Sequence, residues 1–185
     1  MNTKDAIRTR RSVGKMKPDK PPREVIADLL EHAVWAPTHR LLEPWRFHVI
    51  AGEEREKLGA AMETALKASG EVLTDALAKE RAKPLRAPVV IIVTAKPNDD
   101  DILTWENQLA TAAAIQNFML AAHDAGIATF WRTGATIYSK AVADYLELDP
   151  GETVIGAVYV GYSDLPDRVS KRTPAAALTT WRGWS

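Results

Sequence analysis

Helix-like periodicity dominates the first part of the chain. The segment "PPREVIADLLEHAVWA", residues 21–36, repeats apolar residues every three or four positions behind two prolines, which is the pattern of an amphipathic helix. Upstream of it, Thr3 is predicted to cap a short helix that ends near residues 8–10. Residues 53–83 are charged and amphipathic, and we expect a helix in two pieces that is broken near Gly70.

Four segments have the pattern of strands. "WRFHVIAG", residues 45–52, alternates between apolar and polar side chains and stops at a glycine. "APVVIIVTA", residues 87–95, is an unbroken apolar run, which is typical of a central strand that is buried on both faces. Two more strands are predicted for "IATFWR", residues 127–132, and for "TVIGAVYVGY", residues 153–162.

The longest helical pattern is the segment from Leu103 to Gly126, which would be about 35 Å long. Its alanine-rich face favours close helix packing, so we expect it to form the backbone of the core. A further helix is predicted around "SKAVADYLEL", residues 139–148. The tail, residues 164–185, carries Trp181 and Trp184 near its end, and we expect it to pack against something.

Composition narrows the possible classes of protein. A chain of 185 residues with 46% hydrophobic and 26% charged residues fits a single globular domain, residues 1–185. The 24 basic and 24 acidic residues cancel, so no chain-wide field attracts nucleic acid or a membrane surface. With no cysteine, no apolar signal segment and no apolar run of membrane-spanning length, we expect a soluble cytoplasmic protein.

One local charge cluster stands out against this neutral balance. "RTRRSVGKMKPDKPP", residues 8–22, places six cations around Ser12. Guanidinium groups and a hydroxyl are the donors that a phosphate monoester needs, and charge-assisted hydrogen bonds to it contribute about 1.5–3 kcal/mol each. The cluster has no glycine-rich phosphate loop, so its spacing alone leaves two interpretations open, a phosphate site or a solvated basic tail.

Other chemistry is sparse. The four histidines have no spacing typical of a zinc site, and no serine, histidine and aspartate form a recognisable triad. We expect His32 and His123, on predicted helices, to be surface histidines or to have their hydrogen bonds satisfied. His39 alone lies in a loop, "APTHRLLEPW", between two prolines.

Three longer segments together carry a family resemblance. "TRRSVGKMKP", "AVWAPTHRLLEPWRFHVIAGEEREKL" and "AAAIQNFMLAAHDAGIATFWRTG" resemble, in order and spacing, the nitroreductase family of flavin mononucleotide (FMN) enzymes. The resemblance implies an α+β fold, with helices around a central mixed, mostly antiparallel sheet. It also implies an obligate homodimer with two FMN sites at its interface, in which NADH or NADPH reduces small-molecule acceptors such as nitroaromatics, quinones, enones or flavins.

The resemblance also assigns roles to individual residues. It implies that Arg10 and Ser12, with Arg11 beside them, hold the phosphate and ribityl part of the flavin. Its C-terminal basic pair, Lys171 and Arg172, would complete the phosphate site.

The remaining implied contacts concern the flavin ring. His39 would reach the flavin of the partner subunit, and Trp35 precedes it at the end of the same helix. The segment Trp131, Arg132 and Thr133 would lie along the isoalloxazine ring. Without the resemblance, Trp131 would be read as a core aromatic and Arg132 as half of a surface ion pair.

Three features depart from the family pattern and leave a second function open. Gly14 stands where many relatives have a cation, with Lys15 one residue further, and Glu43 replaces a frequent glutamine. The insert that forms a helical lid in larger relatives is short here. The first function is a flavoenzyme that transfers hydride by a ping-pong mechanism without an acid or base of its own. The alternative is an FMN-binding module whose nicotinamide-dependent redox activity is weak or lost.

Overall fold

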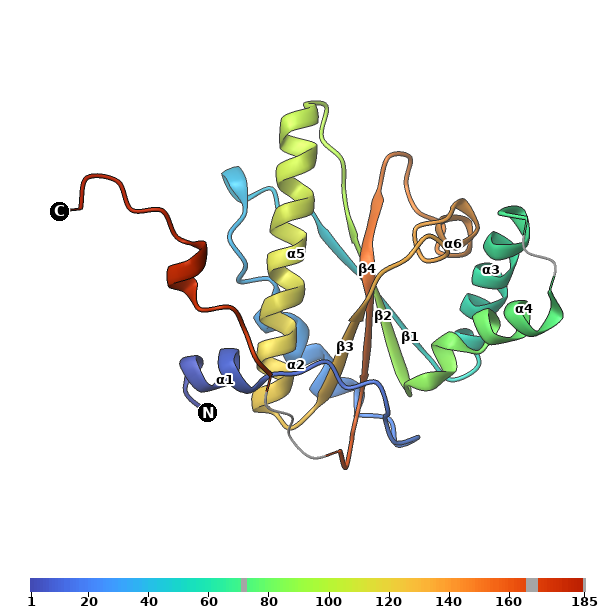
Figure 1. Cartoon of the computed structure of the whole chain (residues 1–185). Helices are drawn as coiled ribbons and strands as arrows, with labels where there is room; N and C mark the ends of the chain where they lie inside the picture. Colours follow the sequence, from blue (N-terminus) through green and yellow to red (C-terminus); the bar gives the residue numbers. More distant parts are fainter. Residues whose placement is uncertain (71–72, 166–169, 185) are drawn as a thin grey trace.

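The computed structural model describes residues 1–70, 73–165 and 170–184 of the chain. Figure 1 shows a central sheet with helices on both faces. The elements, in chain order, are α1 (Thr3–Thr9), α2 (Arg23–Ala33), the short 3-10 helix η1 (His39–Leu41), β1 (Trp45–Ala51), α3 (Glu54–Ala68), α4 (Thr74–Arg81), η2 (Lys83–Arg86), β2 (Val89–Ala95), α5 (Asp101–Asp124), β3 (Ala128–Arg132), α6 (Lys140–Tyr145), β4 (Thr153–Gly161) and η3 (Ala175–Leu178).

The sheet has the strand order β1-β2-β4-β3, and each neighbouring pair runs antiparallel. All seven residues of β2 are buried, which confirms the prediction that this apolar run is a central strand. Val89, Ile91 and Val93 face one core cluster, whereas Val90 and Ile92 face another. The run is apolar except for Thr94, because both faces of β2 are covered.

Two helical layers provide those cores. The first core joins α2 and α5 to one face of the sheet, with Leu29, Ile115 and Phe118 among its buried side chains. The second core joins α3 and α6 to the other face through Leu58, Met62 and Val142. The observed α+β architecture, with helices around an antiparallel sheet, confirms the expected fold class.

The longest helix forms as predicted and begins two residues earlier. Asp100 caps α5, since its carboxylate accepts hydrogen bonds from the backbone N–H groups of Ile102 and Leu103. The first turns are also tied to the end of β2, because the Asn107 amide donates to the Lys96 carbonyl at 3.1 Å. The buried alanines Ala110, Ala114 and Ala122 allow the helix to pack closely on its neighbours.

The start of α1 differs from the prediction, whereas the break between α3 and α4 matches it. Thr3 does not cap α1, because Asn2 occupies that position and its side chain accepts from the N–H of Asp5. The break predicted near Gly70 is confirmed, since α3 ends at Ala68 and α4 begins at Thr74. Residues 71–72 of the expected two-piece helix, and residues 166–169 and 185 of the predicted tail, lie outside the described residues.

The two ends of the chain differ in how they meet the sheet. Ser12 forms a parallel bridge with Thr129 at the edge of β3, and the Val13 N–H donates to the Thr129 carbonyl at 2.9 Å. The C-terminal segment leads away from the body in Figure 1. Trp181 and Trp184 are 67% and 79% exposed and contact each other edge to face. Among the described residues, these two tryptophans therefore pack against each other and not against the core.

Candidate functional site

The cluster of six cations separates in space. Arg10 follows α1 directly as its C-terminal cap and is partly buried. Lys17 instead forms an ion pair of 2.6 Å with Asp164, and Lys20 is exposed. Only part of the basic stretch is therefore available to form an anion site.

Arg10 has the features of an anion site: a buried donor atom and nearby positive charges. Its Nη1 is buried and has no hydrogen-bond partner within the described residues. Burial lowers the pKa of Arg10, and the nearby charges of Arg11 and Arg172 lower it further. A buried guanidinium beside two like charges is unfavourable unless an anion neutralises it. Arg172 is thus brought to Arg10 from the far end of the sequence.

Ser12 and Lys171, which are also expected at the phosphate site, are close in sequence to Arg10 and Arg172, respectively. The bridge to Thr129 holds the backbone of Ser12, and the Ser12 side chain remains exposed. Lys171 is exposed beside Arg172, whose Nη1 donates to the Lys171 carbonyl at 3.1 Å. Arg172 thus comes near Arg10, in the segment whose Ser12 pairs with the edge of β3.

The end of β3 carries the segment expected to lie along a flavin ring. Trp131 is partly buried against the first core, and its Nε1 is buried without a partner in the described part of the chain. A Cβ atom on Gly156 would come within 2.2 Å of this Nε1, so the neighbouring strand accepts the indole only because residue 156 is glycine. Thr133 is exposed just beyond the strand.

Arg132 is placed by aromatic rings. Its guanidinium lies 5.1 Å from the centroid of Phe130 and 5.4 Å from that of Tyr159, distances typical of cation–π contacts. Burial raises the pKa of Tyr159 to about 12, although the positive charges of Arg132 and Arg86 oppose the shift. Arg132 is therefore a cation held at the strand end without a carboxylate in direct contact among the described residues.

Packing does not require glycine at position 14. A Cβ atom there would lie 3.8 Å from the Phe130 ring, which is ordinary van der Waals distance. A larger side chain could begin at this position without displacing its neighbour. The missing cation of the family pattern is therefore not a consequence of crowding.

The His39 loop connects α2 to β1 in an uncommon backbone conformation. Arg40, Leu41 and Glu43 have φ angles of 50°, 54° and 45°, and each such residue costs about 1–2 kcal/mol when it is not glycine. The Thr38 hydroxyl accepts the N–H of Glu43 at 3.3 Å, which closes the loop. The Glu43 side chain itself is exposed.

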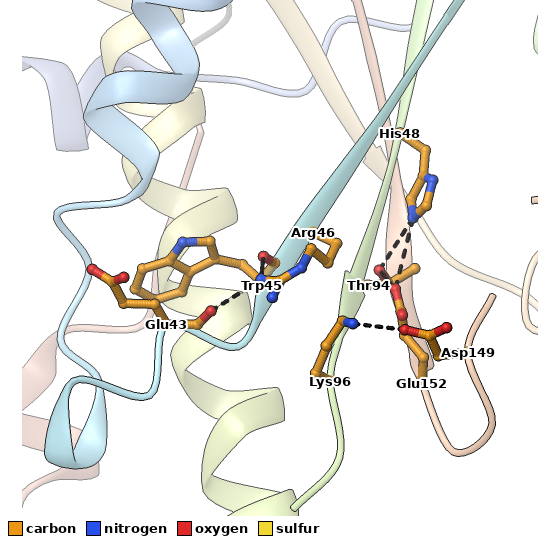
Figure 2. Close-up of polar contacts among 8 residues, drawn as sticks. All are labelled: Glu43, Trp45, Arg46, His48, Thr94, Lys96, Asp149 and Glu152. Carbon is orange, nitrogen blue, oxygen red and sulfur yellow. Dashed lines mark hydrogen bonds and ion pairs between the residues drawn. The ribbon is translucent and has the colours of Figure 1, made fainter.

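The exit of this loop is tied to β1, as Figure 2 shows. The Arg46 guanidinium donates to the carbonyl oxygens of Glu43 at 3.2 Å and Trp45 at 2.7 Å. The Pro44 carbonyl accepts the Lys96 N–H at 2.9 Å from the neighbouring strand. These bonds hold the loop in its strained form.

His39 meets a residue that sequence reasoning missed. Its Nδ1 lies 2.8 Å from Oε2 of Glu106 on α5. The contact has the length of an ion pair but is not aligned as a hydrogen bond. Both side chains line an open hollow of about 470 Å³, together with Pro37, Thr38, Leu109, Ala110 and Ala113. The sequence pattern indicates only the helix face on which Glu106 lies, because Glu106 precedes Ala110 and Ala113 on the small-residue face of α5.

The structure does not bring His39 and Arg10 together. His39 contacts Glu106 near the start of α5, whereas Thr9, beside Arg10, lies 2.8 Å from the His123 ring near its end. Glu106 and His123 are seventeen positions apart on α5, which corresponds to about 25 Å. Trp35 lies on the His39 side and is 84% exposed. Two groups of expected site residues thus lie far apart in one chain.

The remaining histidines are accounted for. His32 Nδ1 lies 2.8 Å from the Asp28 carbonyl oxygen, and His123 contacts Thr9, so both have partners as expected. His48 Nε2 lies 3.4 Å from the Thr94 hydroxyl and 3.7 Å from Oε1 of Glu152 (Figure 2). Within the described residues, no three His, Asp or Glu side chains gather as a metal site would require.

No helix among the described residues is long and apolar enough to cross a membrane.

Comparison with known proteins gives concordant matches. The family model described as "Nitroreductase family" matches residues 7–162. YfhC of Bacillus subtilis (strain 168), provisionally named an NAD(P)H nitroreductase, is 31% identical over 92% of this chain and 89% of its own length. YdjA of Escherichia coli (strain K12), provisionally named in the same way, is 30% identical over 94% of this chain and 95% of its own.

Solved structures agree on the fold. A nitroreductase-like family protein from Bacillus cereus has a TM-score of 0.88 and 26% identity, and covers 100% of this chain and 97% of its own. The FMN-dependent nitroreductase NfnB from Mycobacterium smegmatis, solved in complex with NADPH, has a TM-score of 0.76 and 23% identity, with 97% of each chain covered.

Proposed function

The chain belongs to the nitroreductase family, and from this we propose that it binds FMN and transfers hydride from NADH or NADPH to small organic acceptors. Nitroaromatics, quinones and enones are the acceptor classes that we assign to it. The names of its relatives support the nicotinamide, and the name of the NfnB structure, which includes FMN, supports the flavin.

The observation that carries the proposal is the state of Arg10. A guanidinium that is desolvated, repelled by Arg11 and Arg172, and left with an unpartnered Nη1 fits a doubly charged phosphate. Each charge-assisted hydrogen bond to that phosphate would contribute about 1.5–3 kcal/mol. The FMN phosphate would thus remove the electrostatic cost that the unliganded cluster carries.

We assign the remaining contacts by the positions of the residues. Arg10, Arg11 and Ser12, together with Lys171 and Arg172, would hold the phosphate end. The segment Trp131, Arg132 and Thr133 would lie along one face and one edge of the flavin ring. The positive charge of Arg132 suits a ring that gains electron density on reduction. FMN supplies the hydride chemistry, and the protein supplies binding and orientation.

We propose that the site is shared by two subunits of a homodimer. His39 contacts Glu106 and Thr9, beside Arg10, contacts His123, and these two points lie about 25 Å apart along α5, so we infer that the His39 loop and Arg10 of one chain do not meet on one flavin. A second copy can place its His39 loop near the phosphate cluster of the first. The exposed side chains of Trp35, Leu41, Trp105, Trp181 and Trp184 provide apolar surface for such an interface.

We further propose that turnover is ping-pong. The chain has no cysteine and no recognisable nucleotide-binding fingerprint outside the flavin site. Nicotinamide and acceptor would therefore use the same open face in turn, and double-reciprocal plots with both substrates varied should be parallel. Intersecting lines would argue against a shared site.

The decisive test compares Arg10→Ala with Lys20→Ala. Because Arg10 would lose one or two charge-assisted bonds, we expect FMN affinity to fall by about 2–4 kcal/mol, whereas Lys20→Ala should leave it unchanged. Fluorescence titration of apoprotein with FMN measures both values. Equal effects from the two variants would restore the interpretation as a solvated basic tail.

Reduction of the loaded protein distinguishes the enzyme from an FMN-binding module. A yellow protein that is bleached by NADH or NADPH under anaerobic conditions supports the proposed activity. A yellow protein that neither nicotinamide bleaches would support the module instead. Sedimentation of a stable FMN-loaded monomer at micromolar concentration would contradict the shared site.

A further inference from the structure

Glu106 stands on a rigid part of the molecule. The Asp100 cap and the bond from Asn107 to the Lys96 carbonyl fix the first turns of α5. The Thr104 hydroxyl adds a bond of 2.9 Å to the Asn98 carbonyl. The Glu106 carboxylate is therefore presented from a helix whose position does not depend on the loop opposite it.

Hydrogen bonds also fix the loop that carries His39. Three residues with positive φ persist there only because the Thr38 hydroxyl, the Arg46 guanidinium and the bond to Lys96 hold the backbone. Strain of this kind is retained where the placement of a side chain matters. Two independently fixed elements thus bring the imidazole and the carboxylate together.

The contact uses one particular nitrogen of the ring. Nδ1 faces Oε2 of Glu106 at 2.8 Å, and that oxygen is buried. The contact is not aligned as a hydrogen bond, but two lone pairs at this distance would repel each other, so the nitrogen that faces the carboxylate carries the proton. Within the described part of the chain, no partner is found for Nε2. The open hollow beside the pair leaves this second nitrogen accessible from outside the chain.

We propose that Glu106 is a positioning residue, which fixes the orientation of His39 with Nδ1 protonated and presents Nε2 to the flavin or acceptor bound in the partner subunit. The inference rests on the proposed function, because it takes His39 to reach that shared site. Glu106 itself touches neither flavin nor acceptor. It acts only through the imidazole, as second partners of functional histidines commonly do.

The test uses the FMN-loaded protein with ¹⁵N-labelled histidine. We expect the spectrum of the wild type to show Nδ1 of His39 protonated, and Glu106→Ala to move the resting proton to Nε2. His39→Ala identifies the His39 signals among the four histidines. Glu56 is an exposed glutamate on α3 that forms no ion pair with any residue the structure describes, so Glu56→Ala is the matched control and should change nothing.

Kinetics provide the second readout. We expect Glu106→Ala to lower kcat/KM for the acceptor a few-fold, and by no more than His39→Ala does, while FMN content and melting temperature stay at the wild-type values. In a His39→Ala background the same change should have no further effect, because a positioning residue needs the residue it positions. An unchanged ring spectrum, a loss of FMN in Glu106→Ala, or an equal loss of activity in the His39→Ala background would each overturn the inference.

Experiments on the wild-type protein distinguish failure of the proposed function from failure of the inference about Glu106. A wild-type protein that binds no FMN, or is reduced by neither nicotinamide, refutes that function before any variant is made. The ring spectrum of His39 can still be recorded on such a protein. It therefore decides separately whether Glu106 fixes the imidazole, and an unchanged spectrum in Glu106→Ala overturns the inference in that case too.

Discussion

The chain contains two pairs of histidine and glutamate that are built in different ways. His39 and Glu106 meet through Nδ1 at 2.8 Å beside an open hollow, and both side chains are partly exposed. His48 and Glu152 approach only to 3.7 Å through Nε2, and the Thr94 hydroxyl lies between them and donates to Glu152 (Figure 2). The Glu152 side chain is 4% exposed.

The two pairs differ because different structural elements position their side chains. His48 lies on β1, Thr94 lies on β2, and Glu152 directly precedes β4, which are neighbouring strands of the sheet. The sheet therefore builds this network as part of the fold. The His39 pair instead joins a strained loop to a helix, and nothing in the sheet requires it. A polar pair that the fold does not need is the better candidate for a functional role.

The largest expected effect comes from breaking the sheet network. Thr94→Val keeps the shape of the side chain but leaves the buried Glu152 carboxyl group without its donor. We expect the free energy of unfolding to fall by about 2 kcal/mol, measured by urea denaturation. Thr94→Ser retains the hydroxyl and should recover most of the loss. A valine variant as stable as the wild type would show that the network contributes little to the fold.

A smaller effect should separate the two histidines. His39→Ala is expected to change acceptor affinity or rate modestly, by a few-fold to about tenfold, with the unfolding free energy nearly unchanged because the pair is partly exposed. His48→Ala should do the reverse and lower stability by about 1 kcal/mol without changing the kinetics of the acceptor. Steady-state kinetics and denaturation of both variants check this. The same response from both histidines would remove the contrast between the pairs.

The smallest effect concerns the strain in the His39 loop. Arg40→Gly relieves about 1–2 kcal/mol of backbone strain at φ 50°, but it also gives the unfolded chain more freedom, which offsets about 0.4–1 kcal/mol of that gain. We expect the unfolding free energy to rise by no more than about 1 kcal/mol. Glu147→Gly, at φ 53° behind α6, is the matched substitution outside the site. A loss above 1 kcal/mol in Arg40→Gly would indicate that the arginine side chain, and not the backbone, holds the loop.

The sequence predicted the framework well because periodic patterns are local. The apolar run of β2, the alternation of β1 and the length of α5 all report which faces are buried. The cap of α1 was assigned one residue late, because Asn2 and Thr3 are both good capping residues and only the backbone geometry decides between them.

The candidate site was less predictable. The resemblance supplied Arg10 and His39, yet their separation along α5 emerges only from the fold. Glu106 is 67 positions from His39 in the sequence, and no local pattern can report a contact across that interval. The positive φ angles of Arg40 and Leu41 were equally hidden, since neither residue type favours that conformation.

Gly156 and Trp131 constrain how this chain can change by mutation. Any side chain at residue 156 would collide with the indole, so Gly156 cannot be replaced while Trp131 is present. Once Trp131 becomes smaller, the indole no longer excludes a side chain at residue 156, and only the Arg132 carbonyl oxygen, 3.0 Å from that Cβ, would still have to shift. The two positions are therefore epistatic, because replacement of Gly156 is blocked by the indole unless Trp131 has been replaced first.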